Sequence, residues 1–125
     1  MRILLDTNVL YRWFYENDRL SPHAIRLVQS AGQVFVSAVS LWEISIKARQ
    51  KKIEAVPADL IRLIEGNDFI ELPVSFRHAA AVMDLPLIHA DPFDRLLIAQ
   101  AICEPLRFIT TDSQLGKYTD LVIEV

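Results

Sequence analysis

Carboxylates follow two short apolar segments that lie at opposite ends of the chain. Ile3-Leu4-Leu5 runs into Asp6, and Phe108-Ile109 runs through two threonines into Asp112. Runs of this kind are typical of buried parallel strands. Because ligands collect at the carboxyl ends of strands in open α/β sheets, we expect Asp6 and Asp112 to meet at one edge. Acids that meet there indicate a metal-dependent active site.

Two further acids fall on the apolar faces of expected helices. Glu43 shares its helical face with Val39 and Ile46, and Asp94 borders Leu97. A carboxylate on an apolar face is costly to bury unless it has a partner. We therefore expect Glu43 and Asp94 to project into the same site.

Each of these four acids also has a purely structural interpretation. Asp6 and Asp112 precede expected helices, and aspartate is a preferred N-cap. Asp94 in a first helical turn complements the helix dipole. Glu43 precedes Lys47 by four residues, the favourable order for an ion pair along a helix. The sequence leaves these alternatives open.

The segment before Asp94 holds an additional acid and a histidine. Asp91 directly precedes Pro92 and is expected mainly to cap the helix that begins there. It also lies close enough to Asp94 to join a second metal position. His89 has two interpretations, a contact to substrate near the site or a loop histidine bonded to the backbone, and the second is favoured.

Several carboxylates in one place favour a particular chemistry. They repel one another at neutral pH, so they require raised pKa values or a cation. Mg²⁺ and Mn²⁺ suit oxygen-rich sites, and Mg²⁺ often shares its ligand shell with a substrate phosphate. One ion can activate a water for in-line attack on a phosphodiester, and a second, about 3.5–4 Å away, can stabilise the departing oxygen. The acids therefore indicate phosphodiester hydrolysis.

The elements that would position these acids alternate between strands and helices. Strands are expected at 2–5, 33–36, 69–72, 107–109 and 121–125. Helices are expected near 7–15, 22–31, 38–51, 57–67, 75–83, 92–103 and, as a short one, 113–118. This alternation predicts an α/β fold with a central, mostly parallel sheet flanked by helices.

Composition is consistent with one folded domain over residues 1–125. Hydrophobic residues make up 52% of the chain and there are only three glycines, so a substantial core can form. A mean hydropathy of +0.25 is high for a small domain, and we expect some apolar surface to meet a partner or a second copy. The net charge of −3 does not indicate nucleic-acid binding, nor does it exclude it if acids are concentrated in a metal site.

Membrane and secretory features are not expected. No apolar run approaches the roughly 18 residues of a membrane span, and Asp6 interrupts the first apolar run before it could form a signal peptide. The single cysteine, Cys103, excludes an intramolecular disulfide and is interpreted as core filler. We expect a cytoplasmic protein.

Four motifs, LLDTNVL, SLWEI, DPFDRLLIAQA and ITTDSQL, occur in an order that resembles PIN-domain nucleases, and in particular VapC-like toxins of type II toxin–antitoxin pairs. The resemblance covers essentially the whole chain. It implies a PIN-like domain that acts as a Mg²⁺- or Mn²⁺-dependent endoribonuclease on RNA, often tRNA. It also implies homodimerisation and inhibition by a small antitoxin whose C-terminal segment covers the active-site groove. The family's acidic site maps onto Asp6, Glu43, Asp94 and Asp112, and its polar orienting positions map onto Asn8 and Thr111.

Basic and aromatic residues supply weaker signals. Lys47, Arg49, Lys51 and Lys52 crowd the end of one expected helix, where cations complement the helix dipole. They are also natural phosphate contacts if RNA crosses the site, and Lys47 and Arg95 are the substrate contacts we predict, with Arg12 as a secondary candidate. Among the aromatic residues of the first helix, Phe14 is expected in the core, and Tyr11 or Trp13 at an interface.

Other functions fit less well. A phosphoacceptor receiver domain would need an acidic doublet after the first strand, and a haloacid-dehalogenase-type phosphatase would need an aspartate where Asn8 stands. The remaining alternative is a catalytically silent binding module whose carboxylates serve only as caps and ion pairs.

Overall fold

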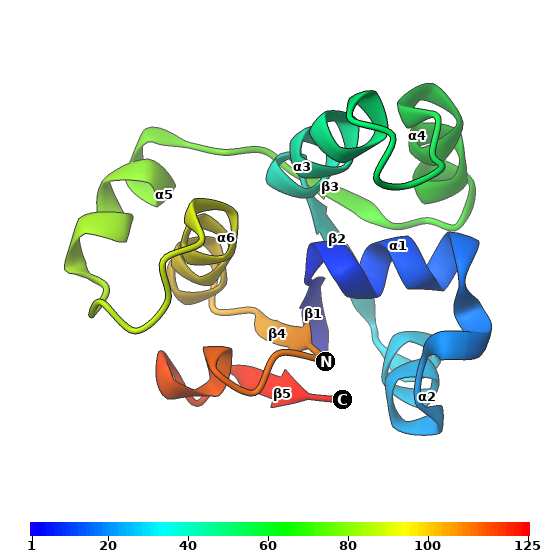
Figure 1. The fold of residues 1–125 in the computed structure, drawn as a ribbon. Coiled ribbons are helices and arrows are strands. Elements are labelled where there is room, and N and C mark those ends of the chain that lie inside the picture. The colour runs from blue at the N-terminus through cyan, green and yellow to red at the C-terminus, as the bar shows by residue number, and fades with distance from the viewer.

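Five short strands pair side by side in the computed structural model, which describes all residues from 1 to 125 (Figure 1). They are β1 (Arg2–Leu5), β2 (Gln33–Ser37), β3 (Ile70–Leu72), β4 (Arg107–Thr110) and β5 (Val122–Glu124). The order across the sheet is β3-β2-β1-β4-β5, and every neighbouring pair is parallel. The predicted α/β fold is confirmed, with a sheet that is parallel throughout.

Six α-helices connect the strands and cover the sheet. They are α1 (Thr7–Tyr15), α2 (Pro22–Ser30), α3 (Ala38–Arg49), α4 (Pro57–Gly66), α5 (Phe76–Ala81) and α6 (Pro92–Cys103). Figure 1 shows α5 and α6 on one side of the sheet and α1 and α2 on the other. Each parallel crossover therefore returns the chain so that the carboxyl ends of all strands point the same way.

Both faces of β1 are buried, which explains its unbroken apolar sequence. Ile3 and Leu5 belong to a core shared with α1, α2 and α4, whereas Leu4 belongs to a second core with Phe108 and residues of α6. Alternate side chains of a strand point to opposite faces, so an apolar run supplies both cores at once. Phe14 packs against the first core as a partly buried side chain, as expected.

Three expected helices are shorter in the structure. The helix expected at 75–83 ends as α5 at Ala81 and continues as a 3-10 turn over Val82–Asp84, because Leu85 is extended before Pro86. The helix expected at 113–118 is only a 3-10 turn over Leu115–Lys117. The helix expected to end at residue 51 ends as α3 at Arg49, because Lys51 adopts a left-handed backbone with φ of 58°.

Helix length also bears on membrane association. None of the helices is both long enough and apolar enough to cross a membrane.

Candidate metal centre

A cavity of about 360 Å³ opens at the carboxyl ends of the central strands. Its lining includes all but one of the residues that the sequence predicted for the site, Arg95 being the exception. The predicted residues in the lining are Asp6, Asn8, Glu43, Lys47, Asp91, Asp94, Thr111 and Asp112. The fold thus brings together side chains from β1, α1, α3, α6 and the segment after β4.

Asp6 is held in place from two sides. Because β1 and β4 are neighbours, the Asp6 N–H donates to the Ile109 carbonyl at 2.9 Å. Its Oδ1 accepts from the Thr7 N–H at 2.7 Å, and its Oδ2 accepts from the Thr110 hydroxyl at 2.6 Å. Asp6 is therefore the N-cap of α1 and also lines the cavity, so the capping interpretation is correct without excluding a role in the site.

The electrostatic environment of Asp6 is unfavourable for its charged form. Burial raises the pKa of Asp6 to about 6, and the charges of Glu43 and Asp112 act in the same direction. The hydrogen bonds from Thr110 and Thr7 oppose this rise. A nearby cation would stabilise the ionised carboxylate.

Glu43 is 6% exposed and has one oxygen that the protein leaves unpartnered. Its Oε2 lies 2.8 Å from Lys47 Nζ, so the predicted ion pair along α3 forms. This hydrogen bond raises the pKa of Lys47. Its Oε1 is buried without a hydrogen-bond partner, which is costly for a carboxylate oxygen. The ion pair therefore gives a partner to Oε2 and leaves Oε1 without one.

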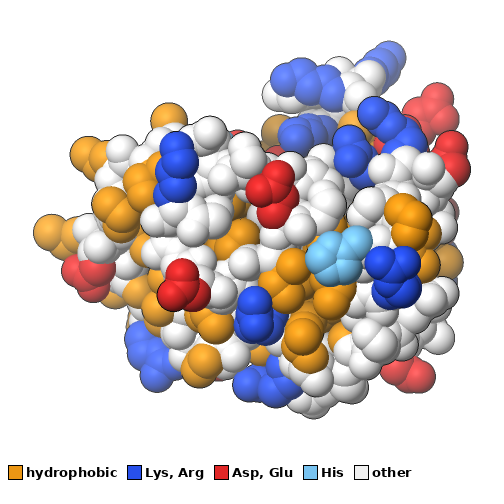
Figure 2. Space-filling model, turned by 90° about the horizontal axis from the view of Figure 1, so that it is seen from below, with side chains coloured by type: hydrophobic (Ala, Val, Ile, Leu, Met, Phe, Trp, Pro, Cys, Tyr) orange, Lys and Arg blue, Asp and Glu red, His pale blue; other side chains and the backbone are white.

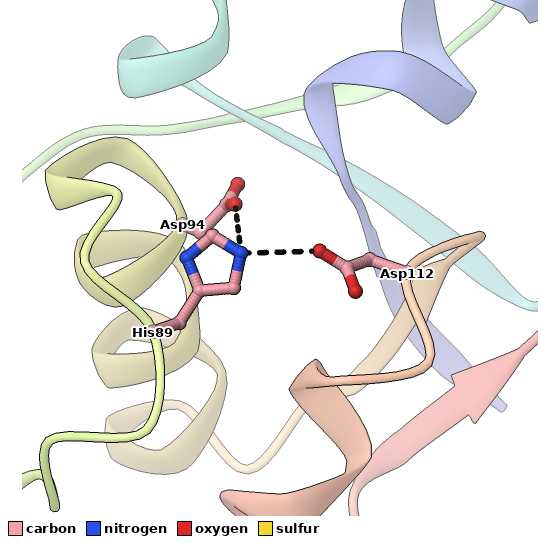
Figure 3. A group of neighbouring side chains, drawn as sticks. All are labelled: His89, Asp94 and Asp112. Atoms are coloured by element: carbon pink, nitrogen blue, oxygen red, sulfur yellow. Dashed lines mark ion pairs between the residues drawn. The ribbon is translucent and has the colours of Figure 1, made fainter.

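Asp94, Asp112 and His89 form a tight group beside the cavity (Figure 3). One ligand atom from each lies within 4.8 Å of the other two. His89 Nε2 is 3.3 Å from Asp112 Oδ2 and 3.8 Å from Asp94 Oδ2. The favoured interpretation of His89 as a loop histidine bonded to the backbone is confirmed by the Asp91 N–H, and its other ring nitrogen faces the acids of the site.

The hydrogen bonds of His89 determine which ring nitrogen carries the proton. Its Nδ1 accepts from the Asp91 N–H at 3.1 Å, so a neutral imidazole holds its proton on Nε2. Nε2 therefore carries the proton on the side of the ring that is nearest to the Asp112 and Asp94 carboxylates. His89 would have to give up this proton to bind a metal ion through Nε2.

Asp94 has a larger rise in pKa than Asp6. Its pKa is raised to about 8, first by burial and then by its carboxylate neighbours. These neighbours are Asp6, Asp91, Glu43 and Asp112. Five carboxylates therefore act on one another around a single cavity.

Asp91 has the capping role that the sequence predicted. Its Oδ1 accepts from the N–H groups of Phe93 at 2.8 Å and Asp94 at 3.2 Å, at the start of α6. Asp112 likewise accepts from the Gln114 N–H at 2.9 Å. The bond to Gln114 is a turn contact and not a helix cap, because the 3-10 turn that follows has Gln114 at its N-cap position. Asp91 and Asp112 both line the cavity, so these bonds orient their carboxylates without removing them from the site.

The two predicted polar residues contact each other. Asn8 Nδ2 donates to the Thr111 hydroxyl at 3.3 Å, which links the first turn of α1 to the segment after β4. Asn8 and Thr111 therefore brace the two strand ends that carry Asp6 and Asp112.

Arg95 is placed differently from the expected substrate contact. Its guanidinium donates to the carbonyls of Pro86, Val82 and Leu85 at 2.8–3.3 Å. It also donates to the Tyr118 hydroxyl at 3.2 Å. Arg95 thus anchors the 82–86 segment to α6, and its position does not support a contact to substrate.

The donor set matches a hard divalent cation. Carboxylate oxygens dominate the lining, one of them is buried without a partner, and the Asp6 and Asp94 pKa values are raised. Mg²⁺ and Mn²⁺ prefer such oxygen ligands. The residues present therefore fit a divalent metal ion.

Comparison with known proteins identifies the family of the chain. A family model described as PIN domain matches residues 3–121. Ribonuclease VapC22 from Mycobacterium tuberculosis is 35% identical over 120 residues, which cover 93% of this chain and 91% of that protein.

Solved structures share the fold at lower sequence identity. VapBC2 from Rickettsia felis, bound to a promoter DNA fragment, aligns with a TM-score of 0.74 at 16% identity over 99% of this chain and 98% of that chain. A toxin–antitoxin complex from Klebsiella pneumoniae aligns with a TM-score of 0.70 at 19% identity, covering 98% and 99%. On the matched family model and the 35% identical relative, this chain belongs to the PIN-domain family, as a VapC-like member.

Proposed function

We propose that the protein is a Mg²⁺- or Mn²⁺-dependent endoribonuclease that acts in the cytoplasm as the toxin of a toxin–antitoxin pair. The observation that carries the proposal is the group of five carboxylates around one cavity, with Glu43 Oε1 buried and unpartnered. The relationship to a protein named as a ribonuclease supports RNA as the substrate. We propose tRNA as the RNA class to test first.

Each residue of the cavity has a defined task in this proposal. Asp6, Glu43, Asp94 and Asp112 would hold the divalent cation, with Asp91 available for a second position. The cation would supply neutralisation of the phosphate charge and activation of water for hydrolysis. Asn8, Thr110 and Thr111 fix the strand ends, and so keep the carboxylates in position.

His89 contributes a proton donor beside these acids. Its Nε2 lies 3.3 Å from Asp112 Oδ2, while Nδ1 accepts from the Asp91 N–H. If a cation engaged Asp112, the Nε2–H of His89 would be available to donate to a phosphate oxygen of the substrate.

A catalytically silent binding module accounts for fewer of the observations. Capping explains one oxygen each of Asp6 and Asp91, and a turn contact explains one oxygen of Asp112. These contacts explain neither the unpartnered oxygen of Glu43 nor the charge cluster around Asp94, whose side chain caps no helix. The nuclease is therefore the better supported function.

The proposal predicts metal-dependent cleavage of RNA by the purified protein. Total tRNA and an unstructured RNA should be cut in Mg²⁺ or Mn²⁺, and cutting should stop in EDTA. The readout is gel electrophoresis of end-labelled RNA, with Asp6→Asn protein prepared in parallel to detect contaminating nucleases. Equal cleavage by wild type with EDTA, or by the variant, would contradict the proposal.

We further propose a homodimer, for which an exposed apolar patch gives support. Phe76, Met83 and Leu87 are 98%, 90% and 93% exposed, on α5 and the segment after it. Figure 2 shows hydrophobic side chains protruding at its left edge, on the side where Figure 1 places α5. Exposed side chains of this size commonly mark an interface.

The dimer makes its own prediction. Met83→Glu should shift the protein from dimer to monomer in sedimentation velocity, because an interfacial charge would lose its water. Leu63→Glu, on α4 where Leu63 is 39% exposed, is the matched control. A wild type that sediments as a monomer at high micromolar concentration would exclude the dimer.

The antitoxin partner is also a proposal. The structural neighbours include VapBC2 and a toxin–antitoxin complex, which supports a small protein partner for this chain. We propose that the C-terminal segment of this partner covers the active-site groove. Co-expression with the neighbouring reading frame would then abolish the metal-dependent cleavage.

A further inference from the structure

A second groove adjoins the metal cavity and opens along α1. It encloses about 710 Å³ and is formed by α1, the 3-10 turn after it, and the segment after α3. Asn8, Tyr11 and Ile53 line both the groove and the metal cavity. A ligand that occupies the metal cavity can therefore extend directly into this groove.

The charge of the groove is opposite to that of the cavity. Arg12, Lys51 and Lys52 line it, and none of them takes part in an ion pair of the protein. Glu16 and Arg19 also line it but pair with each other at 3.4 Å, so their charges largely cancel. One further acid, Glu54, lines the groove. Three available cations against one acid leave this groove positive in a chain whose net charge is −3.

Arg12 is the cation that most clearly lacks a protein partner. Its Nε is buried without a hydrogen-bond acceptor. By contrast, Arg95 donates to three loop carbonyls and so has a structural explanation. A buried guanidinium N–H that the protein leaves unsatisfied requires an acceptor from elsewhere. A phosphate oxygen is such an acceptor, and arginine matches phosphate geometry well.

The walls of the groove are fixed in relation to each other. The Tyr11 hydroxyl donates to the Glu54 carbonyl at 3.2 Å, which ties the segment after α3 to α1. The rings of Tyr11 and Tyr15 stack with centroids 5.0 Å apart. At the end of α3, the Lys52 N–H donates to the Lys47 carbonyl, and Lys51 takes the left-handed backbone that ends the helix. The two lysines are thus held at the rim of the groove.

We propose that this groove binds the phosphate backbone of single-stranded RNA next to the bond that is cleaved. The inference rests on the proposed ribonuclease function and adds the path of the strand away from the metal centre. Arg12, Lys51 and Lys52 contact successive phosphates, while the acidic cavity takes the scissile phosphate together with the cation. Without positive residues beside it, the acidic cavity would repel an RNA strand.

The test measures RNA binding apart from cleavage. The probe is a fluorescein-labelled oligouridylate of about 12 nucleotides, followed by fluorescence anisotropy in EDTA at several salt concentrations. The variant is Lys51→Asn/Lys52→Asn, since asparagine tolerates the left-handed backbone at position 51. Arg26→Ala/Arg62→Ala removes the same charge from exposed positions that line neither the groove nor the metal cavity, and serves as the control.

We expect the lysine variant to bind the probe about 25-fold more weakly at about 0.1 M salt. Each phosphate contact to a single strand contributes about −0.7 to the slope of log K against log[salt]. The loss of two contacts should therefore make this slope shallower by about 1.4. The control should keep the wild-type slope. Arg12→Ala should weaken binding in the same way, and Arg12→Lys should restore part of it because the charge returns.

Three other results would overturn the inference in distinguishable ways. If wild type cleaves RNA with metal but the lysine variant keeps the wild-type affinity and slope, the groove assignment fails and the ribonuclease function stands. If wild type neither binds the probe nor cleaves RNA, the proposed function fails together with the groove. If wild type cleaves RNA with metal but binds a fluorescein-labelled hexaglutamate peptide and not the oligouridylate probe, the groove is assigned to a protein segment and the RNA assignment is overturned.

Discussion

Replacing Asp94 with asparagine is expected to abolish metal-dependent RNA cleavage while increasing the stability of the metal-free protein. Asp94 is only 15% exposed at its side chain, and its pKa is raised to about 8 by burial and by neighbouring acids. The neutral amide has nearly the same shape but lacks the charge that a cation requires. Loss of one metal-binding carboxylate should therefore reduce cleavage by at least about 100-fold.

The gain in stability follows from the same carboxylate. At neutral pH the unfolded chain ionises Asp94, whereas the metal-free fold favours the protonated form. A pKa unit corresponds to about 1.4 kcal/mol, so the gain is on the order of 2 kcal/mol at pH 7 when half of the shift is offset by water in the cavity. Asparagine should relieve this cost because it carries no charge.

The two effects can be measured on the same preparations. Urea unfolding in EDTA gives the free energy of unfolding, and end-labelled RNA gives the cleavage rate. Asp120→Asn, an exposed aspartate that does not line the cavity, is the matched control and should change neither. Wild-type cleavage by the Asp94→Asn protein would remove Asp94 from the proposed active site.

The fold was predictable because local signals agree with the tertiary structure. Apolar runs such as Ile3-Leu4-Leu5 can be buried only between two layers of helices, and the structure buries them on both faces of the sheet. Ser21 before Pro22 gave the start of α2, and its hydroxyl accepts from the Ala24 N–H at 3.1 Å. Where such signals are weak, as after Ala81, the predicted helix was too long.

The site was predictable where strand topology or the face of a helix determines it, as the helix faces of Glu43 and Asp94 do. Asp6 and Asp112 follow two strands that become neighbours, so parallel pairing alone brings their side chains together. The role of Thr110 was not visible, because its hydroxyl reaches Asp6 only in the register that the sheet adopts. Sequence reasoning thus found the acids but missed a residue that fixes one of them.

Residues 82–91 show why the remaining contacts could not be predicted. The Tyr118 hydroxyl accepts from the His89 N–H at 2.8 Å, and Arg95 donates to three carbonyls of the same segment. These tertiary bonds hold the segment so that His89 faces Asp94 and Asp112. They also use the N–H donors of the Arg95 guanidinium. A loop set by distant side chains leaves no periodic signal in the sequence, although the spacing of His89 and Asp94 was a local hint.

Stability in EDTA is expected to fall as the pH rises from about 4 to about 8. The pKa values of Asp6 and Asp94 are raised in the fold, to about 6 and about 8, from an ordinary value of 3.8. Across this window the folded protein holds more protons than the unfolded chain, so the free energy of unfolding decreases with pH. Between pH 5 and 8 the loss should be on the order of 3 kcal/mol, after an allowance of about half for water and coupling between the two acids.

A divalent cation should reverse this dependence. The ion requires ionised carboxylates, so its affinity increases as the pH rises and the cost of ionising Asp6 and Asp94 is offset by the bound charge. Mn²⁺ at about 100 times its dissociation constant stabilises a fold by about 2.7 kcal/mol. The increase in Tm caused by a fixed Mn²⁺ concentration should therefore be several degrees larger at pH 8 than at pH 5.5. Asp94→Asn should flatten the EDTA profile and abolish most of the Mn²⁺ effect, whereas Asp120→Asn should leave both unchanged. A metal-free stability that stays constant over this range, or an equal Mn²⁺ effect at both pH values, would show that these carboxylates do not form one metal-binding cluster.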